Sequence, residues 1–457
     1  MSESVVVRGA SALKKRMGDG TSAVFAAHLI TILTRFASNL ILTRIVDPAA
    51  FGVVAILFSV QTILTMATDL AVLPFYVRKE TLRQDTLSTL WTIKLIRDAA
   101  LAVVVFVFAD PIAALFGHAE AGNALRVFSV VMLLSALQSP ALFDLARDRR
   151  LFRASLFQLI TQVGTSLATV AFAVALKSYW AIVYGCIAGA AISLLLSYRM
   201  LKLGARPRFA LDAETLSDLW KMARLTLPAS LITLALSQID RVYIGRNFPV
   251  AELGMYSLAM TIVMAVSTFT ERYVNTVYLP TISQRRRDVP DALRRDAYVV
   301  RWRFTCAMFF ALGGLSATGV LVARLLFPES YHNVGIYIAI GCIGPLADLL
   351  RSPSETVLYT SGAFRINLVG NLLRLVYVVG LGPFVFAHFE PIAVLYLLGS
   401  SALVPVPYYW WRLSRAGLLD LSWEARFVGA GALGFAIGTL GQEAIFALVD
   451  AGWLPRF

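Results

Sequence analysis

Two arginines and an aspartate carry ionisable groups at places where such groups are costly. Arg35, Asp348 and Arg374 each lie near the middle of a long apolar stretch. Translocon scales set the cost of Arg or Asp at mid-bilayer at ~2.5–3.5 kcal/mol. Two explanations remain open: a structural pair, with an arginine held by Asp69 or Asp348, or a polar lumen that binds an anion. We favour the lumen, because a guanidinium fork stays charged and matches phosphate and carboxylate oxygens.

Other polar residues recur at helical spacing along the same stretches, so each set shares one helix face. Ser and Thr on these faces are explained by close helix packing and by bonds to their own backbone. Amide side chains fit that explanation less well, and we expect them to line the lumen. The amide candidates are Asn39, Gln158, Gln162, Asn367 and Asn371.

The elements that position these residues are apolar stretches, about thirteen of them, each long enough for a helix to cross a ~30 Å hydrocarbon core. The predicted spans are 21–43, 51–76, 89–109, 123–145, 152–176, 179–200, 223–245, 251–279, 303–327, 333–359, 364–387, 391–411 and 426–449. With 58% hydrophobic residues, the chain lies far outside the usage of soluble proteins. The sequence therefore predicts an all-α polytopic membrane protein.

The segments between the spans are alternately basic and nearly neutral. The basic ones are 1–19, 78–88, 146–153, 199–224, 281–303, 360–365 and 412–426. The positive-inside rule then places the N-terminus in the cytoplasm. The net charge of +13 is better explained by this topology and by anionic lipid than by nucleic acid. Among the charges inside spans, Asp98 is predicted to pair with Lys94 one helical turn away.

The sequence offers little for a metal, a disulfide or a signal peptide. Cys186, Cys306 and Cys342 all fall inside spans and are expected to be buried thiols. The four histidines are scattered, so we assign no metal and no cofactor. The segment 1–20 lacks the apolar core of a signal peptide and is expected to lie at the cytoplasmic membrane surface.

An internal repeat predicts two matched halves. Arg44, Ala49 and Gly52 recur at the same spacing as Arg246, Ala251 and Gly254. Six spans return a chain to its starting side, so the halves would be six-helix lobes around a central cavity, a recurring transporter plan. The predicted parts are an N-lobe (21–200), a cytoplasmic linker (201–222), a C-lobe (223–412) and an extra C-terminal hydrophobic helix (426–449).

Three segments carry a resemblance to a known family: LTRIVDPAAFGVVAI (42–56), RPRFALD (206–212) and SQIDRVYIGRNFPVAELGMYSLA (237–259). The chain resembles the polysaccharide transporter (Wzx-type) flippases of the multidrug/oligosaccharidyl-lipid/polysaccharide exporter superfamily. The resemblance covers about residues 20–415 and implies two six-helix lobes in a V around a cavity. It also implies that cavity arginines meet the pyrophosphate and any acidic sugar. We assign this anion-binding role to Arg35, Arg374 and Arg272.

The resemblance implies a flippase that moves undecaprenyl-pyrophosphate-linked oligosaccharide units across the bacterial cytoplasmic membrane by alternating access. Such a protein serves exopolysaccharide, capsule or O-antigen assembly, and its partners are the lipid-linked substrate, membrane lipid and a polysaccharide polymerase with its chain-length machinery. The candidates for coupling to a proton or cation are Asp69, Asp348 and Glu271, among which no spacing selects one. The thirteenth span departs from the family's commonest plans.

Three other functions fit the sequence less well. A drug/cation antiporter of the same superfamily would favour an acidic cavity, against which Arg35 and Arg374 speak. A flippase for the peptidoglycan lipid precursor would carry more spans and more cavity arginines. A membrane glycosyltransferase or polysaccharide polymerase would present a large outer loop, whereas the longest here is about 110–122, DPIAALFGHAEAG. No nucleophile constellation or phosphate-binding glycine loop is present in the sequence, so we do not expect an enzyme.

Overall fold

The computed structural model describes most of the chain as helices joined by short turns. The described residues are 24, 26–79, 84–148, 150–200, 208–360, 366–451 and 453. The predicted surface segment 1–20 and the first part of the predicted linker, 201–207, lie outside the described residues. The chain divides into two compact units, Met1–Leu231 and Ile232–Phe457.

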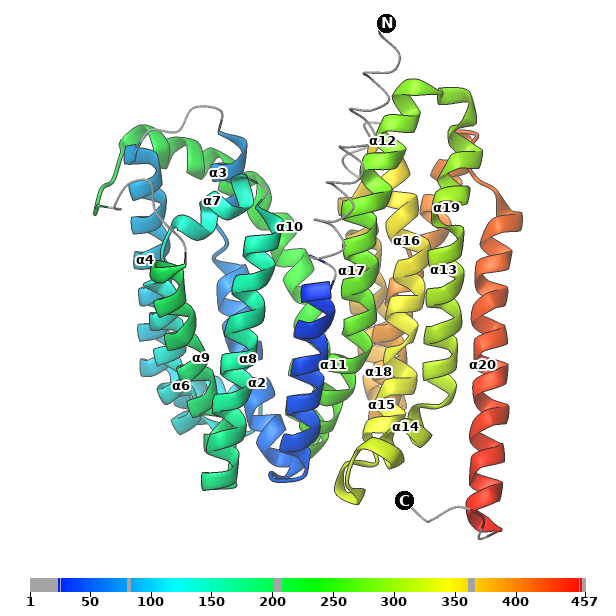
Figure 1. Ribbon diagram of the computed structural model, residues 1–457, viewed down its shortest axis with the longest axis horizontal. Coiled ribbons are helices and arrows are strands. Elements are labelled where there is room, and N and C mark those ends of the chain that lie inside the picture. The colour runs from blue at the N-terminus through cyan, green and yellow to red at the C-terminus, as the bar shows by residue number, and fades with distance from the viewer. Residues whose placement is uncertain are drawn as a thin grey trace, which may run out of the picture. The chain divides into compact units, whose positions relative to one another are not determined.

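The first unit is made of helices joined by short connections (Figure 1). After a first helix, Ala26–Thr43, they are α2 (Pro48–Ala67), α3 (Val72–Arg78), α4 (Gln84–Val107), α5 (Ala109–Leu115), α6 (Ala121–Ala136), α7 (Ala141–Arg147), α8 (Leu151–Leu176) and α9 (Tyr179–Arg199). Helix α10 (Ala213–Asn247) begins in the first unit and ends in the second, with Pro228 inside it.

The second unit is built in the same way. Its helices are α11 (Val250–Tyr273), α12 (Leu279–Asp288), α13 (Leu293–Ala317), α14 (Gly319–Leu326), α15 (Val334–Gly341), α16 (Ile343–Thr360), α17 (Ile366–His388), α18 (Pro391–Ser400), α19 (Val406–Arg415) and α20 (Leu421–Asp450). A π-helical turn, η1 (Val274–Tyr278), joins α11 to α12. Short 3₁₀ turns are η2 (Pro290–Ala292), η3 (Glu329–Tyr331) and η4 (Ser401–Leu403).

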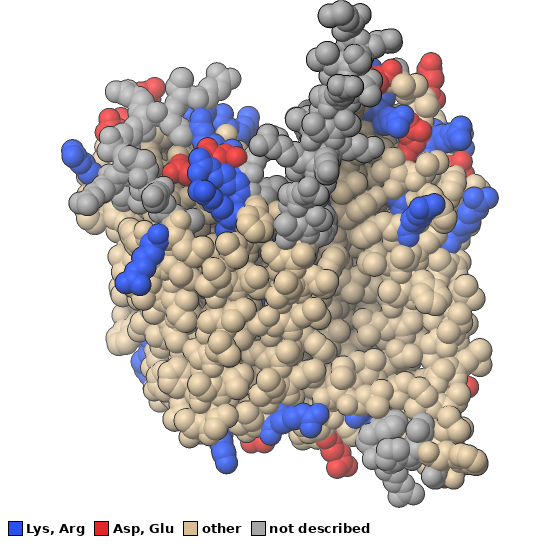
Figure 2. Space-filling model, viewed as in Figure 1, with Lys and Arg blue, Asp and Glu red and all other residues tan. Residues whose placement is uncertain are grey.

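The lengths of these helices confirm the prediction of a polytopic helical membrane protein. Nine helices among the described residues are long and apolar enough to cross a membrane, and up to 12 if each sharply bent pair forms one span. The shorter apolar helix α6 adds a candidate at the predicted span 123–145. On the face shown in Figure 2, charged side chains gather near the ends of the helices, and the surface between is almost free of them.

Several predicted spans differ from the helices in detail. The stretch 51–76 was predicted as one span, but α2 ends at Ala67 and α3 begins at Val72. Ala71 between them has φ 52°, a left-handed conformation that no α-helix contains. The stretch 303–327 bends by 70° between α13 and α14. Apolar length therefore located the spans but did not reveal where the backbone turns inside them.

Helix α20 packs along α13 (Figure 1), and glycines allow the two backbones to approach closely. A Cβ at Gly313 would overlap the carbonyl oxygen of Gly431, and one at Gly434 would overlap that of Phe310. Asp420 caps α20 by accepting a hydrogen bond from the Ser422 N–H at 3.1 Å. The Ser422 side chain also donates to this exposed carboxylate and, with the backbone bond, lowers the pKa of Asp420. The predicted extra C-terminal helix is thus a 30-residue helix anchored on the second unit.

Candidate functional site

The second unit contains a chamber of about 310 Å³ whose lining residues all belong to that unit. We call it the Arg374 chamber. Its polar wall consists of Asp240 and Arg241 near the end of α10, Asp348 on α16, and Asn371 and Arg374 on α17. Its apolar wall includes Met260 and Met264 on α11, Ile340 on α15 and Leu398 on α18. Three helices thus bring two carboxylates, two guanidinium groups and an amide around one space.

Helix periodicity and a glycine explain why this space exists. Asn371 and Arg374 are three residues apart on α17, so both project toward the same side. Gly344 on α16 also lines the chamber, and a Cβ built there would meet no atom within 4 Å. The missing side chain therefore leaves open volume in the chamber, on the same face of α16 as Asp348.

Arg374 keeps hydrogen-bonding capacity unused in this chamber. Its Nε is buried and has no hydrogen-bond partner among the described residues. The two carboxylates that line the chamber, Asp240 and Asp348, have other partners among the described residues. Tyr256 donates to Asp240 Oδ2 at 2.5 Å, and Arg351 forms an ion pair with Asp348 at 3.0 Å. The second oxygen of Asp240, Oδ1, is buried and likewise without a partner among the described residues.

A second space, of about 370 Å³, shares Asp348 with the first. We call it the Arg351 chamber, after the arginine in its lining. Arg351 lies between two carboxylates on its own helix, Asp348 at 3.0 Å and Glu355 at 3.0 Å. Asn367 on α17 donates to the other oxygen of Glu355 at 2.5 Å. Glu271 and Asn275 also line this chamber, at the junction of α11 and η1. Because three carboxylates face one arginine, this chamber is acidic.

The structure brings five predicted site residues together in the second unit. Asn371 and Arg374 line the Arg374 chamber, Glu271 and Asn367 line the Arg351 chamber, and Asp348 lines both. Asn371 donates to the side-chain oxygen of Asn367 at 2.7 Å, which links the two chambers along α17. Arg272, the neighbour of Glu271, lies in the lining of neither chamber.

The predicted residues of the first unit are more dispersed. Arg35 lies on the first helix with its side chain exposed, and Asn39 follows one turn later, partly buried. Gln158 on α8 is exposed, whereas Gln162 donates to Ser166 at 3.1 Å. The structure places these four residues on two helices, the first helix and α8.

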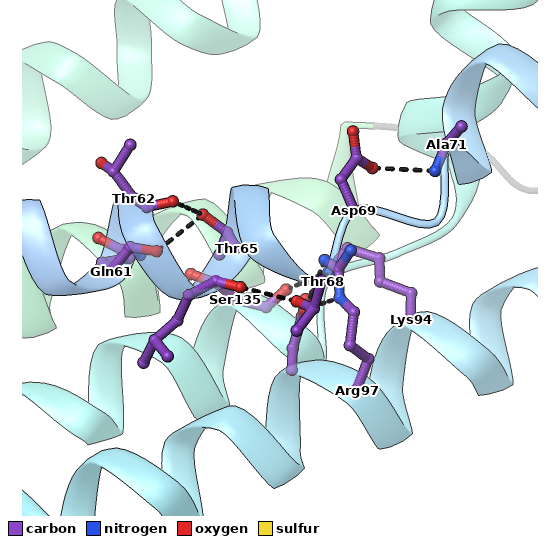
Figure 3. A network of polar contacts seen from close by, with 11 residues as sticks. Gln61, Thr62, Thr65, Thr68, Asp69, Ala71, Lys94, Arg97 and Ser135 are labelled. Carbon is purple, nitrogen blue, oxygen red and sulfur yellow. Dashed lines mark hydrogen bonds and ion pairs between the residues drawn. The ribbon is translucent and has the colours of Figure 1, made fainter. Parts of the chain in front are cut away.

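The first unit does contain a compact polar cluster, shown in Figure 3. Asp98 accepts from Lys94 at 2.8 Å and from Arg97 at 2.6 Å, which confirms the predicted pairing of Asp98 with Lys94. Lys94 also donates to the backbone oxygen of Ser135 on α6 at 2.9 Å. Asp69, at the end of α2, accepts from the Ala71 N–H at 2.9 Å and so caps the interruption before α3. The charges of this cluster are therefore used in holding helices together.

Four charged residues of the second-unit chambers were not among the predicted site residues: Asp240, Arg241, Arg351 and Glu355. A usable signal was present for Asp240, because it continues the polar face of Thr233 and Ser237 at helical spacing. Arg351 also lies on one face with Asp348 and Glu355, at the spacings of three and four residues that favour ion pairs. The buried pair of Arg301 on α13 and Glu424 on α20 gave no such local signal.

The fold of this chain is that of a multi-pass membrane transporter. It is similar to the structure of the lipid II flippase MurJ in its inward closed conformation, with a TM-score of 0.66 and 14% identity over 92% of this chain and 91% of that one. An inward-facing multidrug resistance MATE family transporter of the MOP superfamily gives a TM-score of 0.58, with 13% identity over 93% of this chain and 98% of that one.

The sequence comparisons define the family. The model of the family described as "Polysaccharide biosynthesis protein" matches residues 41–336, and the chain belongs to this family. The succinoglycan biosynthesis transport protein ExoT of Rhizobium meliloti is 23% identical over 63% of this chain and 58% of its own length. The amylovoran biosynthesis protein AmsL of Erwinia amylovora is 21% identical over 65% of this chain and 78% of its own. The resemblance inferred from the three sequence segments is thereby confirmed.

Proposed function

We propose that this protein is a flippase that moves lipid-linked oligosaccharide repeat units across the bacterial cytoplasmic membrane by alternating access. The lipid carrier would be undecaprenyl pyrophosphate, and the product would feed exopolysaccharide, capsule or O-antigen assembly. The N-terminus would lie in the cytoplasm, as the distribution of Lys and Arg predicts. Membership of a polysaccharide biosynthesis family and the fold shared with a lipid II flippase support this proposal.

The observation that carries the proposal is the unpaired Nε of Arg374 in a polar chamber among membrane helices. A buried hydrogen-bond donor without a partner costs ~1–3 kcal/mol, and a donor on a charged group costs more. Such a cost is repaid when a ligand supplies the missing acceptor. The sugars and the pyrophosphate of a lipid-linked oligosaccharide are rich in acceptor oxygens. Arg374 lines a chamber in which such an oxygen could accept a hydrogen bond from its Nε.

The remaining predicted residues take supporting roles. Arg35 and Arg272 are proposed to attract the pyrophosphate and acidic sugars, because a guanidinium group binds such anions in bidentate fashion. Asn39, Gln158, Gln162, Asn367 and Asn371 would hydrogen-bond the glycan. Asp69, Asp348 and Glu271 remain candidates for coupling to a proton or cation, and among them Asp348 has the added feature that it lines both chambers.

A drug/cation antiporter is the second candidate, since Asp240 and Asp348 also line the Arg374 chamber and the fold is shared with a multidrug transporter. A polysaccharide polymerase or glycosyltransferase has less support, because the family and the fold are those of transporters. The two transport functions predict different cellular defects. A flippase mutant accumulates lipid-linked repeat units, whereas an antiporter mutant becomes sensitive to cationic drugs.

The test is a deletion strain complemented with the wild-type gene or with the Arg374→Ala variant. We expect the deletion to remove surface polysaccharide and to accumulate lipid-linked repeat units on the inner face of the membrane. The wild-type gene restores export, and Arg374→Ala does not, although the protein accumulates in the membrane. An Arg35→Ala variant tests the corresponding role in the first unit.

The matched control is Arg324→Ala, since Arg324 on α14 lines neither chamber and stacks on Phe446 instead. This variant should export normally. Unchanged surface polysaccharide in the deletion strain, together with new sensitivity to cationic drugs, would replace the flippase with the antiporter. Normal export by both Arg374→Ala and Arg35→Ala would remove the assignment of these two arginines.

A further inference from the structure

We infer that the Arg374 chamber binds one uncharged sugar ring of the translocated glycan and that the pyrophosphate binds elsewhere. This inference rests on the proposed flippase function and assigns to one chamber one part of the substrate. The family resemblance implies that Arg374 binds an anion. The inference changes this role, so that Arg374 forms hydrogen bonds with sugar hydroxyls instead. Three features of the chamber support it: its charge balance, its free hydrogen-bonding groups and its size.

The charges of the chamber are already balanced. Asp240 and Asp348 oppose Arg241 and Arg374, so the four ionisable groups in the lining sum to zero. The ion pair of Asp348 with Arg351 lies just behind the wall, and Arg351 also serves Glu355. A pyrophosphate would bring at least two negative charges beside two carboxylates, and like charges in a low-dielectric site repel strongly. A neutral ligand avoids this repulsion.

The free groups of the chamber suit hydroxyls. Arg374 Nε offers a donor and Asp240 Oδ1 offers an acceptor, and both are buried without a partner among the described residues. A hydroxyl group donates one hydrogen bond and accepts others, so a ring with several hydroxyls satisfies both kinds of group at once. A phosphate offers only acceptors for the arginine and would leave Asp240 unsatisfied. A metal or organic cation would satisfy Asp240 and leave Arg374 without an acceptor.

The size and the apolar wall suit a single ring. Small-molecule sites have volumes of about 300–1,000 Å³, and the chamber, at about 310 Å³, lies at the lower end of that range. The ring's C–H faces are apolar and can pack on Met260, Met264 and Ile340. A longer glycan would have to extend beyond the chamber, so we infer that the chamber selects one sugar of the repeat unit.

The experiment uses the purified full-length protein in lipid nanodiscs and measures its thermal stability with four separate probes. The probes are a panel of neutral methyl hexosides, inorganic pyrophosphate, sodium ion and tetraphenylphosphonium. A ligand that binds only the folded protein raises the melting temperature, by an amount that grows with the ratio of its free concentration to its Kd. We expect at least one methyl hexoside to stabilise the wild-type protein, and we expect the other three probes to act no differently on Gly344→Leu than on the wild type.

The decisive variant fills the chamber without disturbing its neighbours. Gly344→Leu places a side chain into the open space, and Gly380→Leu on α17 is its matched control, because a Cβ at Gly380 also meets no atom within 4 Å and Gly380 lines neither chamber. We expect Gly344→Leu to weaken methyl hexoside binding about tenfold or more, because the leucine side chain occupies volume that the ring needs and overpacking costs about 1–3 kcal/mol. It should also abolish export, whereas Gly380→Leu should change neither measurement.

Asp240→Asn gives a second, nearly isosteric variant in case Gly344→Leu does not accumulate. It gives the chamber a net positive charge, so we expect weaker binding of the hexoside and stronger binding of pyrophosphate than in the wild type. Pyrophosphate or a cation binding in the wild-type chamber, with loss in Gly344→Leu, would overturn the inference. So would normal export by Gly344→Leu in a strain that needs the wild-type gene for export, a result that leaves the flippase function standing. If the wild-type gene itself does not support export, the proposed function fails first.

Discussion

The second helix begins alike in the two halves of the chain and ends differently. Gly52 and Gly254 lie near the starts of α2 and α11, and the same interval separates Asp69 from Glu271 and Tyr76 from Tyr278. In the first half the helix stops at Ala67, and the chain passes through Ala71 at φ 52° before α3. In the second half the matched residues 270–273 form the last turn of α11, and the π turn η1 follows without a break in the helix.

This difference changes what the matched acidic residue does. Asp69 accepts the Ala71 N–H and caps the interruption. Glu271 has no such turn to cap, and it lines the Arg351 chamber with Asn275 of the π turn. A π turn inserts a residue into a helix without ending it, and such turns often occur at functional sites. One half therefore uses this position to hold its fold, and the other presents it to a chamber.

The ion pairs of the two halves give the largest expected contrast. Arg301 and Glu424 in the second half have side-chain exposures of only 4% and 1%, and Arg301 also stacks on Tyr298 and Phe427. Glu424→Ala would leave a buried arginine unpaired, and we expect the free energy of unfolding to fall by about 3–5 kcal/mol. Asp98→Ala in the first half should cost less, about 2 kcal/mol, because Lys94 keeps its bond to Ser135. Thermal unfolding of the purified variants measures both.

The control for this prediction is the double variant Arg301→Met with Glu424→Leu. Replacing both partners of a buried pair with apolar side chains is often neutral or stabilising. Recovery of most of the lost stability would support the pairing of α13 with α20. Equal losses in Glu424→Ala and Asp98→Ala would contradict the contrast between the halves.

Glycine contacts between helices give the next contrast. A Cβ at Gly434 on α20 would overlap backbone atoms of Phe310, whereas one at Gly189 on α9 would overlap only the side chain of Thr165 on α8. Overpacking typically costs about 1–3 kcal/mol, and we expect Gly434→Ala to reach the upper end. The melting temperature of Gly189→Ala should be partly restored by Thr165→Ala. No restoration would mean that α8 and α9 also meet through rigid backbone.

The matched tyrosines give a smaller effect. Tyr76 donates to the carboxylate of Asp144 at 2.5 Å, and Tyr278 donates to the backbone oxygen of Ala297 at 3.1 Å. A hydrogen bond to a charged group is worth about 1.5–3 kcal/mol and a neutral one about 0.5–1.5 kcal/mol. Tyr76→Phe should therefore destabilise the protein more than Tyr278→Phe. The reverse order in thermal unfolding would argue against Asp144 as the ionised partner of Tyr76.

The backbone interruption itself gives the smallest effect. A left-handed residue with a Cβ costs about 1–2 kcal/mol, and glycine removes most of that cost while adding chain entropy. We expect Ala71→Gly to stabilise the protein by about 0.5–1 kcal/mol. The control is Tyr273→Gly at the matched position in the second half, which lies in α11 and should be destabilised. Destabilisation by Ala71→Gly would place Ala71 in an ordinary helical conformation.

The fold was predictable to the level of helices because a membrane imposes a minimum apolar length, and the stretches in the sequence meet it. The ends of α2 and α13 were not predictable, because nothing in a run of apolar residues marks where a backbone bends. Arg374 and Asp348 were singled out by their cost at mid-bilayer and Asn371 by its amide on a polar helix face. All three line the Arg374 chamber, and their part in transport stays a prediction. The pairing of Glu424 with Arg301 was not predictable, since the sequence places Arg301 in a basic segment assigned to the cytoplasm. The duplication into two lobes, suggested by the repeat, stays a prediction.

Asp348 is the one side chain among the described residues that the two chambers have in common. Its carboxylate is held by Arg351 on one side and faces Arg374 across the other. A ligand in one chamber that binds the Asp348 carboxylate would weaken the interaction of this carboxylate with a ligand in the other chamber. By thermodynamic linkage such an effect would be reciprocal. Under the proposed function, the shared carboxylate would let a coupling ion in one space and a sugar in the other change each other's affinity without direct contact.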